Sequence, residues 1–309
     1  MLQIGLGCWG LGSTSYGSVS EDEAKKILFC AYDSGIRFFD TAPLYGEGLS
    51  ETRLGKYLPI DSEITIATKV GIVSDTQGIL KKNLNTKNII DSVENSLKRL
   101  KREYIDLVQL HSPELNFESD ILFNSLFELI NSGKVRKFGI SLKTPKYLKV
   151  QHKLFPWASF QYNCSILDQR IVESHQLVNE YLSHSLKLIA RTPLNFGFLT
   201  GQPPNIENLT SNHHLKNWHR EQLLDWLGKR IKVIDALKGS DFNILAAALR
   251  FPIDAGLANI VIPGATTKSQ LLTNIKAFSQ PLPQEIIKNL ADLFRDYTFE
   301  RSPYTTVID

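Results

Sequence analysis

Ile64-Thr65-Ile66-Ala67-Thr68-Lys69 is a short, largely apolar stretch whose β-branched residues predict a strand, and its last residue is a lysine. Two other stretches have the same character and also end in a polar residue, namely Ile36–Asp40 and Ile105–His111. Tyr45 follows the first of these in the next turn. A parallel barrel collects its catalytic groups at the carboxyl ends of its strands. These residues therefore indicate a barrel, provided that the chain contains enough strands.

Strand-like runs that are short, continuous and rich in β-branched or aromatic residues recur along the chain. This pattern is typical of strands that are covered on both faces. In order, the expected strands are Gln3–Cys8, Ile36–Asp40, Ile64–Lys69, Ile105–His111, Lys137–Ser141, Ala158–Tyr162, Lys187–Arg191 and Asn259–Pro263.

Helical patterns fall between these strands. Ser20 and Glu23 have the spacing of a capping box at the start of the first helix, and Thr86 opens another. Further helices are expected at Ser119–Ser132, Pro145–Leu154, Arg170–His184, Asn243–Ala255, Ser269–Phe278 and Pro283–Arg295, and an irregular loop at Thr200–Glu221.

Eight strands that alternate with helices predict a (β/α)8 TIM barrel, with residues 1–309 forming a single domain. The alternative is a doubly wound sheet, which needs a glycine-rich loop that leads straight into a helix. Gly5-Leu6-Gly7-Cys8-Trp9-Gly10 has the glycine spacing of such a loop, but the next helix begins only near Ser20. The barrel is therefore favoured.

The composition argues against several classes of partner and site. The net charge of +3 leaves no strong footprint for nucleic acid or for a membrane surface. The basic run Lys98–Arg102 is interpreted as a solvated helix end. Three scattered cysteines and no signal-like start indicate a reducing, cytoplasmic location. No metal site is expected, because His213, His214 and His219 lack zinc-site spacing and are interpreted as exposed loop residues.

The four residues at the strand ends form a set that can donate a proton. A free phenol has a pKa of about 10, which is too high for efficient proton donation at neutral pH. The ammonium of Lys69 is expected to lower the pKa of Tyr45, and the carboxylate of Asp40 to keep Lys69 charged. His111 is expected to orient a carbonyl oxygen. The set suits proton transfer to a carbonyl that receives a hydride.

The motifs resemble those of the aldo-keto reductase superfamily. The similarity lies in Phe38-Phe39-Asp40-Thr41-Ala42-Pro43-Leu44-Tyr45-Gly46 with Glu51, then in Ala67-Thr68-Lys69 and Leu110-His111. It extends over nearly the whole chain. The resemblance implies a TIM barrel, NAD(P)H-dependent carbonyl reduction, and Tyr45 as the general acid, tuned by the other three residues.

The same resemblance implies a cofactor site. Ser141 and Gln161 match residues that hold the nicotinamide carboxamide, and Arg191 matches a branch that places arginine beside the nicotinamide. The segment from Ile262 to Thr267 resembles the part that binds the adenosine phosphate. The expected cofactor contacts are Gly7, Trp9, Ser141, Gln161, Arg191, Pro193, Leu194, Gly264, Thr266, Lys268, Gln270 and Asn274.

Three features depart from the family pattern. Leu142 stands where asparagine is common, and Thr267 stands where arginine is frequent. Because Lys268 follows and could reach a 2′-phosphate, NADP(H) is favoured and NAD(H) is the alternative. Family members usually open with a hairpin that plugs the floor of the barrel, whereas Met1 runs almost directly into the first strand. Something else is expected to cover the floor, or the floor is more open.

The rim loops indicate an open pocket that suits a small carbonyl compound or a sugar. The loop Ser112–Ser119 and the tail after Arg295 are short, and Trp9 and Tyr16 are expected near the pocket mouth. Two other functional classes stay open: a non-catalytic binding or regulatory subunit, and an aldolase that forms a Schiff base on Lys69. A monomer or a small homo-oligomer is expected.

Overall fold

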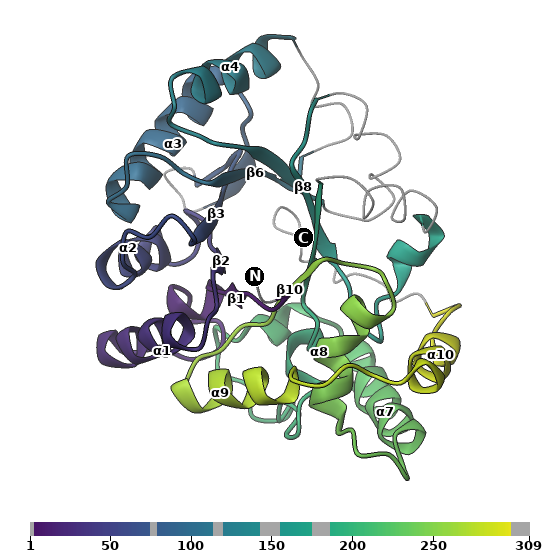
Figure 1. Ribbon diagram of the computed structural model, residues 1–309. Coiled ribbons are helices and arrows are strands. Elements are labelled where there is room, and N and C mark those ends of the chain that lie inside the picture. Colours follow the sequence, from purple (N-terminus) through teal and green to yellow (C-terminus); the bar gives the residue numbers. More distant parts are fainter. Residues whose placement is uncertain (1–2, 75–78, 114–119, 143–154, 175–185, 298–309) are drawn as a thin grey trace.

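Eight parallel strands form one sheet that curls into a barrel, with the helices packed around it (Figure 1). The computed structural model describes residues 3–74, 79–113, 120–142, 155–174 and 186–297. The strands are β1 (Leu6–Gly7), β2 (Phe38–Asp40), β3 (Thr65–Val70), β6 (Leu107–His111), β7 (Phe138–Ser141), β8 (Ser159–Asn163), β9 (Lys187–Arg191) and β10 (Ile260–Ile262).

The barrel closes because its first and last strands meet. Each strand pairs in parallel with the next one in the order just given. Bridges join Ile4 to Val261 and Gly7 to Gly264, so β10 returns to β1. The predicted TIM barrel is confirmed, and each predicted strand overlaps an observed one.

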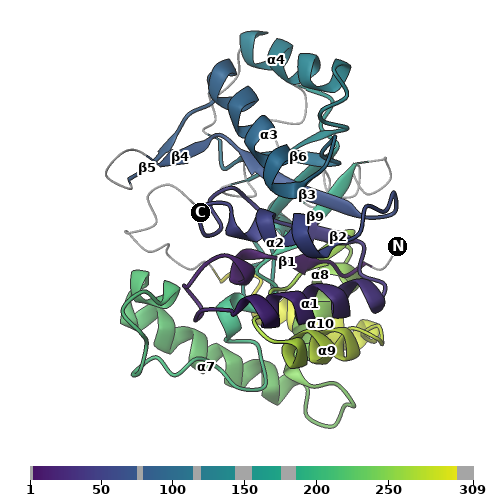
Figure 2. The same ribbon diagram turned by 90° about the vertical axis from the view of Figure 1, so that its left-hand side faces the viewer.

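The helices cover the outer face of the sheet (Figure 2). Ser20 accepts a hydrogen bond from the Glu23 amide, so the predicted N-terminal cap of the first helix is present. The helices are α1 (Glu21–Asp33), α2 (Leu49–Tyr57), α3 (Thr86–Leu100), α4 (Asp120–Asn131), α7 (Arg220–Ala236), α8 (Ile244–Asp254), α9 (Lys268–Ala277) and α10 (Gln284–Leu293).

Several elements differ from the sequence expectation. Helix α2 was not expected because its buried face includes Ser50, Glu51 and Arg53, which interrupt the apolar period. Helix α7 begins at Arg220, inside the segment that was expected to be an irregular loop. A small antiparallel hairpin, β4 (Ile72–Ser74) with β5 (Leu80–Lys82), follows β3 and was also not expected.

Two predicted helices fall largely outside the described part of the chain. The expected helix Pro145–Leu154 lies entirely outside it. Of the expected helix Arg170–His184, the structure describes Arg170–Ser174, which is a short 3-10 helix.

The apolar core has two parts. The larger part lies between the sheet and the helices. The smaller part fills the barrel, where side chains alternate in and out along each strand, so that Phe38, Ala67 and Leu107 lie one layer below Asp40, Lys69 and Gln109. This inner layer consists of Phe38, Ala67, Leu107, Ile189, Ile260 and Ile262. Every member is at most 5% exposed. Side chains of the strands themselves therefore fill the interior above the floor.

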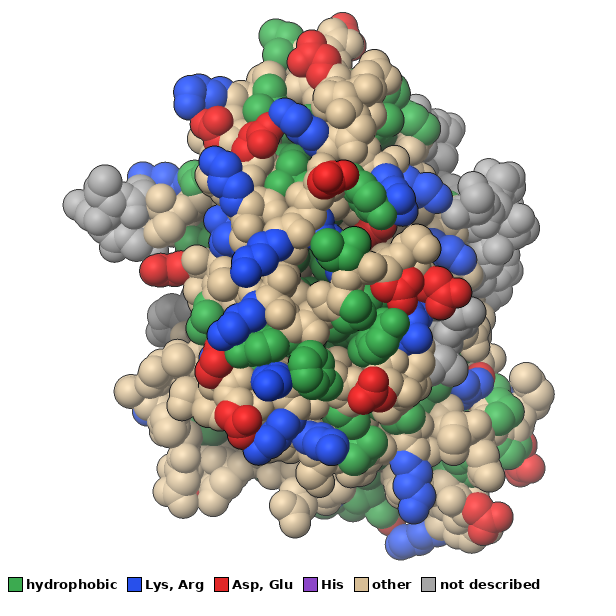
Figure 3. Space-filling model, turned by 60° about the vertical axis from the view of Figure 1, so that its left-hand side comes forward, with side chains coloured by type: hydrophobic (Ala, Val, Ile, Leu, Met, Phe, Trp, Pro, Cys, Tyr) green, Lys and Arg blue, Asp and Glu red, His purple; other side chains and the backbone are tan. Residues whose placement is uncertain are grey.

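The basic run Lys98–Arg102 is only partly a solvated helix end. Arg99 forms an ion pair with Glu51, which is fully buried and also accepts a hydrogen bond from Thr68. The hydrogen bond between Thr68 and Glu51 joins β3 to α2 next to Lys69. Elsewhere on this side of the barrel, basic and acidic side chains are interspersed (Figure 3). No helix within the described ranges is long and apolar enough to cross a membrane.

Candidate active site

Three strands and one turn bring the four sequence-predicted catalytic residues to the same end of the barrel. Asp40 is the last residue of β2, Lys69 lies near the end of β3, and His111 is the last residue of β6. Tyr45 lies in the turn after β2. That turn packs closely against Gly12, where a Cβ atom would meet the Tyr45 carbonyl oxygen at 2.1 Å. Glycine at this position therefore allows the loop after β1 to hold the backbone of Tyr45 in place.

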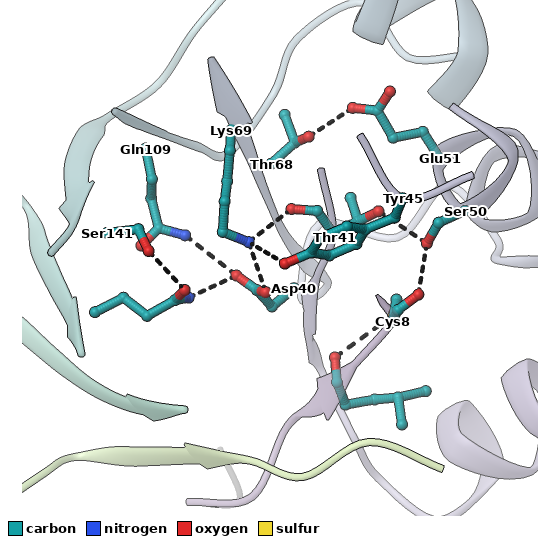
Figure 4. Close-up of polar contacts among 12 residues, drawn as sticks. Cys8, Asp40, Thr41, Tyr45, Ser50, Glu51, Thr68, Lys69, Gln109 and Ser141 are labelled. Atoms are coloured by element: carbon teal, nitrogen blue, oxygen red, sulfur yellow. Dashed lines mark hydrogen bonds and ion pairs between the residues drawn. The ribbon is translucent and has the colours of Figure 1, made fainter. Parts of the chain in front are cut away.

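Lys69 is the centre of the candidate site (Figure 4). Its Nζ donates hydrogen bonds to Asp40 Oδ2 at 2.7 Å, to the Thr41 carbonyl oxygen at 2.9 Å and to the Tyr45 hydroxyl at 3.2 Å. Lys69 is 1% exposed and Asp40 is 3% exposed. An ammonium that is buried this deeply needs such partners, because burial without them would neutralise it.

Burial and charge oppose each other in setting the pKa of Lys69. Burial lowers the pKa of Lys69, but the interactions of Lys69 with the Asp40 carboxylate and with the Tyr45 hydroxyl together outweigh burial and raise this pKa above its ordinary value. The expectation that Asp40 keeps Lys69 charged agrees with this direction.

The direction expected for Tyr45 is corrected. Burial and, to a smaller extent, the charge of Asp40 raise the pKa of Tyr45, and together they outweigh the lowering by Lys69 and Arg191, so the pKa of Tyr45 lies above its ordinary value. Sequence reasoning counted the ammonium but not the loss of water around the phenol. At neutral pH the phenol of Tyr45 is thus protonated, and Lys69 Nζ is close enough to its hydroxyl to stabilise a phenolate.

His111 is neutral near pH 7. Its pKa lies well below the ordinary value because the ring is buried and because the positive charges of Lys69 and Arg191 oppose protonation of the ring. A neutral imidazole still carries one N–H donor, which is what orientation of a carbonyl oxygen requires.

Acid is expected to destabilise the protein through His111. An unfolded histidine has a pKa of about 6.5. Below that pH, His111 therefore binds a proton in the unfolded chain but not in the folded protein. The free energy of unfolding then falls as the pH decreases, by about 1.4 kcal/mol per pH unit for one proton. We expect the Tm of the wild type to fall between pH 7 and pH 5 more steeply than that of His111→Asn. Equal slopes in the two proteins would contradict this explanation.

The residues expected around the nicotinamide lie beside Asp40, Tyr45, Lys69 and His111, which are called the tetrad below. Ser141 Oγ donates to Gln161 Oε1 at 3.1 Å, and Gln161 Nε2 donates to Asp40 Oδ1 at 2.6 Å. Arg191 ends β9 and donates to the Leu142 carbonyl oxygen at 3.0 Å. Pro193 and Leu194 follow Arg191 in the same rim loop. The structure thus places this group at the same rim as Tyr45.

The second expected group surrounds the start of α9. Gly264 follows β10 and lies opposite Gly7. Asn274 Nδ2 donates to the Gly264 carbonyl oxygen at 3.3 Å, and Gln270 Oε1 accepts from the amide of Thr266 at 2.8 Å. Gln270 and Asn274 therefore fix this turn. The Lys268 amide donates to Glu23 Oε1 of α1 at 2.6 Å, a contact that sequence reasoning missed.

An aromatic wall adjoins Tyr45. The ring of Trp9 stacks on the ring of Tyr45, with 6.2 Å between centroids. Tyr16 and His214 contact Trp9 edge-on at 5.4 Å and 4.9 Å. The prediction that all three loop histidines are exposed is wrong for His214, which is buried, and His213 is half-buried. Only tertiary packing brings His214 to the site, so no sequence signal could have placed it.

Sequence reasoning also missed Gln109, although a signal was present. Gln109 is fully buried in β6, and its Nε2 donates to Asp40 Oδ1 at 3.2 Å. It lies two residues before His111, and the strand period of two places both side chains on the same face.

Comparisons with known proteins find a family and relatives that match most of the chain. The model of the aldo/keto reductase family matches residues 3–294. A probable aldo-keto reductase 1 from Glycine max is 29% identical over 299 residues, which cover 94% of this chain and 84% of the relative.

Solved structures are similar over nearly the whole chain. The holo form of an aldo-keto reductase from Bacillus halodurans superposes with a TM-score of 0.79 and 28% identity, covering 97% of this chain and 94% of that one. A glycerol dehydrogenase from Gluconobacter oxydans also gives 0.79, with 25% identity, and covers 99% of this chain and 93% of that one.

Proposed function

The chain belongs to the aldo/keto reductase family, which is a family of NAD(P)H-dependent oxidoreductases, and we propose that it reduces an aldehyde or a ketone to an alcohol. One observation carries the proposal. Lys69 Nζ contacts both Asp40 Oδ2 and the Tyr45 hydroxyl in a buried position. A charged lysine next to a phenol is the arrangement that proton transfer to a carbonyl oxygen needs.

Each residue of the tetrad has one task in the proposed reaction. The reduced dinucleotide, when bound, supplies a hydride to the carbonyl carbon. The Tyr45 hydroxyl gives its proton to the carbonyl oxygen, and the neutral His111 donates a hydrogen bond that orients that oxygen. Lys69 stabilises the phenolate that remains, and Asp40 keeps Lys69 charged. The product alcohol thus gains one hydride and one proton.

The residues present fit a dinucleotide. Ser141, the last residue of β7, and Gln161, its partner in β8, offer a hydroxyl and a side-chain amide, which match the donor and acceptor atoms of a carboxamide. In the rim loop after β9, Asn195 is 2% exposed, and its Nδ2 has no hydrogen-bond partner within the described residues. A buried amide nitrogen of this kind can donate to a phosphate oxygen.

The alternative functions are less well supported. A Schiff-base lysine must lose its proton to act as a nucleophile. Instead, the ion pair with Asp40 raises the pKa of Lys69 against the effect of burial. A purely regulatory role would not need a buried charge with three well-placed hydrogen bonds.

We propose a small polar carbonyl compound, such as a sugar, as the substrate. Trp9 and Tyr16 form an aromatic wall beside Tyr45, and one similar structure is that of a glycerol dehydrogenase. Most of the loop Ser112–Ser119 and the tail beyond residue 297, from which an open pocket was predicted, lie outside the described residues. The test is a panel of aldehydes, ketones and aldoses, with loss of reduced-dinucleotide fluorescence as the readout. If the protein binds a dinucleotide but oxidises it with no member of the panel, the proposal fails.

For the cofactor we propose NADP(H), with Glu23 as the residue that limits its affinity. Lys268 has an exposed side chain that can meet a 2′-phosphate, but its amide is hydrogen-bonded to the Glu23 carboxylate. A carboxylate repels a phosphate at close range.

Replacing Glu23 by glutamine should therefore favour NADPH. Glu23→Gln keeps an oxygen that can accept from the Lys268 amide and removes the charge. We expect the Kd for NADPH to fall about tenfold, which is about 1.4 kcal/mol, and the Kd for NADH to change less than about twofold. Quenching of protein fluorescence by each dinucleotide measures both constants.

Asp22→Asn is the matched control for Glu23→Gln. It removes one negative charge from the neighbouring residue, which forms an ion pair with Lys26 at the surface. Equal gains in NADPH affinity from both variants would mean that overall charge, and not the contact of Glu23 with α9, is responsible.

A further inference from the structure

Asp40 accepts hydrogen bonds from three donors that come from three different strands. Figure 4 labels two of these donors, Lys69 and Gln109. Lys69 of β3 occupies Oδ2 at 2.7 Å. Gln161 of β8 and Gln109 of β6 both reach Oδ1, at 2.6 Å and 3.2 Å. The carboxylate is thus held from both sides, by a charge at one oxygen and by two amides at the other.

The two glutamines differ in what else they contact. Gln161 also accepts a hydrogen bond from Ser141, and both of these residues are proposed contacts of the nicotinamide. Gln109 is fully buried, and its side-chain amide donates to Asp40. Gln161 therefore contacts both Asp40 and Ser141, a proposed contact of the nicotinamide, whereas the side-chain amide of Gln109 contacts Asp40.

A glutamine at position 109 is expected to lower the stability of the fold. Leu107, on the same face of β6, belongs to the apolar layer inside the barrel. Gln109 Oε1 is buried and has no hydrogen-bond partner within the described part of the chain. A buried acceptor without a partner destabilises a fold, so stability alone does not explain an amide here.

We infer that Gln109 is a positioning residue that fixes the Asp40 carboxylate toward Lys69 and moderates its negative charge, whether or not Gln161 is engaged by the cofactor. The inference rests on the proposed function. It makes the network one continuous path from Tyr45 through Lys69 and Asp40 to Gln161 and Ser141, with Gln109 as its fixed support.

The electrostatic consequence for Tyr45 has a definite sign. The charged groups that act on Tyr45 are Lys69, Asp40 and Arg191, and Asp40 raises the pKa of Tyr45 whereas the two cations lower it. An amide N–H directed at Asp40 Oδ1 partly neutralises that carboxylate. Loss of the amide strengthens the effect of Asp40, so the Tyr45 phenolate becomes harder to form.

The test is Gln109→Met, which has a similar volume and lacks the donor. In alcohol oxidation Tyr45 acts as the base, so the rate rises with pH as the phenol ionises. We expect this rising limb to move to higher pH by about 0.5 unit and kcat for reduction at neutral pH to fall about tenfold, because small displacements at a reacting centre are costly. The KM for the carbonyl substrate and the Kd for the dinucleotide should stay within about twofold of the wild type.

Gln169→Met is the matched control. Gln169 is also a buried glutamine, but its amide donates to the carbonyl oxygens of Ile166 and Leu290, away from the tetrad. We expect it to lower the Tm and to leave the pH limb in place, which separates a positioning role from a general loss of stability.

A second variant covers the case in which Gln109→Met does not fold. Gln109→Glu can donate to Asp40 only while it is protonated, so its activity relative to the wild type should decline as the pH rises. The inference is overturned if the rise of the oxidation rate with pH is not shifted in Gln109→Met, or if the activity of Gln109→Glu relative to the wild type does not change with pH. Either result leaves the proposed reaction intact. A wild-type protein that oxidises no dinucleotide with any carbonyl compound overturns both.

Discussion

Tyr45→Phe is expected to lower kcat for carbonyl reduction by about 10³-fold, the range typical of a general acid. The substitution removes one oxygen atom, and that oxygen is the group that contacts Lys69 at 3.2 Å. Lys69 keeps Asp40 and the Thr41 carbonyl oxygen as acceptors, so its charge stays satisfied. Steady-state kinetics with the best substrate of the panel, together with the Tm, provide the measurement.

The loss of activity in Tyr45→Phe can be attributed to the missing proton donor only if this variant still binds the dinucleotide. The Kd for the dinucleotide should stay within about twofold of the wild type. Tyr57→Phe is the control, because its hydroxyl contacts Glu21 on the outer surface, and it should have normal activity. If Tyr45→Phe retained wild-type kcat, another group would supply the proton and the mechanism proposed above would be wrong.

Lys69→Met is expected to lose both activity and stability. Removal of one partner from a buried ion pair leaves the other charge without compensation, which costs about 3–5 kcal/mol. Asp40 would keep its two amide donors but lose the only ammonium that is bonded to it in the described structure. Unfolding in urea measures the loss, and single-turnover kinetics under folding conditions measure the reaction.

The double variant Lys69→Met with Asp40→Asn separates the two effects. The amide that replaces the carboxylate is neutral, so no unpaired buried charge remains, and most of the lost stability should return while activity stays absent. Lys56→Met, which removes an exposed ion pair with Glu21, should change the stability little. If the double variant were no more stable than Lys69→Met, the burial of an uncompensated Asp40 would not be the cause of the loss.

The strand ends were predictable because their pattern is local. Asp40 and His111 end their strands and Lys69 lies one residue before the end of β3, and the short apolar runs before them indicate where a buried strand stops. Tyr45 was placed by its motif, but its stacking on Trp9 depends on how two rim loops pack against each other. The sequence therefore indicated which residues meet, but not how their rings lie.

Other features could not be read from the chain. The pKa of Tyr45 depends on how completely the fold removes water, a quantity that no local pattern contains. The burial of His214 and the contact of Glu23 with α9 join segments that are far apart in sequence. Helix α2 was not recognised in the sequence because its buried face lacks an apolar stripe. That face carries Glu51, which forms an ion pair with Arg99 of α3.

The apolar layer inside the barrel separates Asp40 and Lys69 from the floor of the barrel. Phe38, Leu107 and Ile260 lie where water would otherwise approach Asp40 and Lys69 from below. In the proposed reaction, the proton that Tyr45 gives away would then be replaced from the rim side of the barrel, where Tyr45 lies. Departure of the proposed product and reprotonation of Tyr45 would consequently take place on the same side of the barrel.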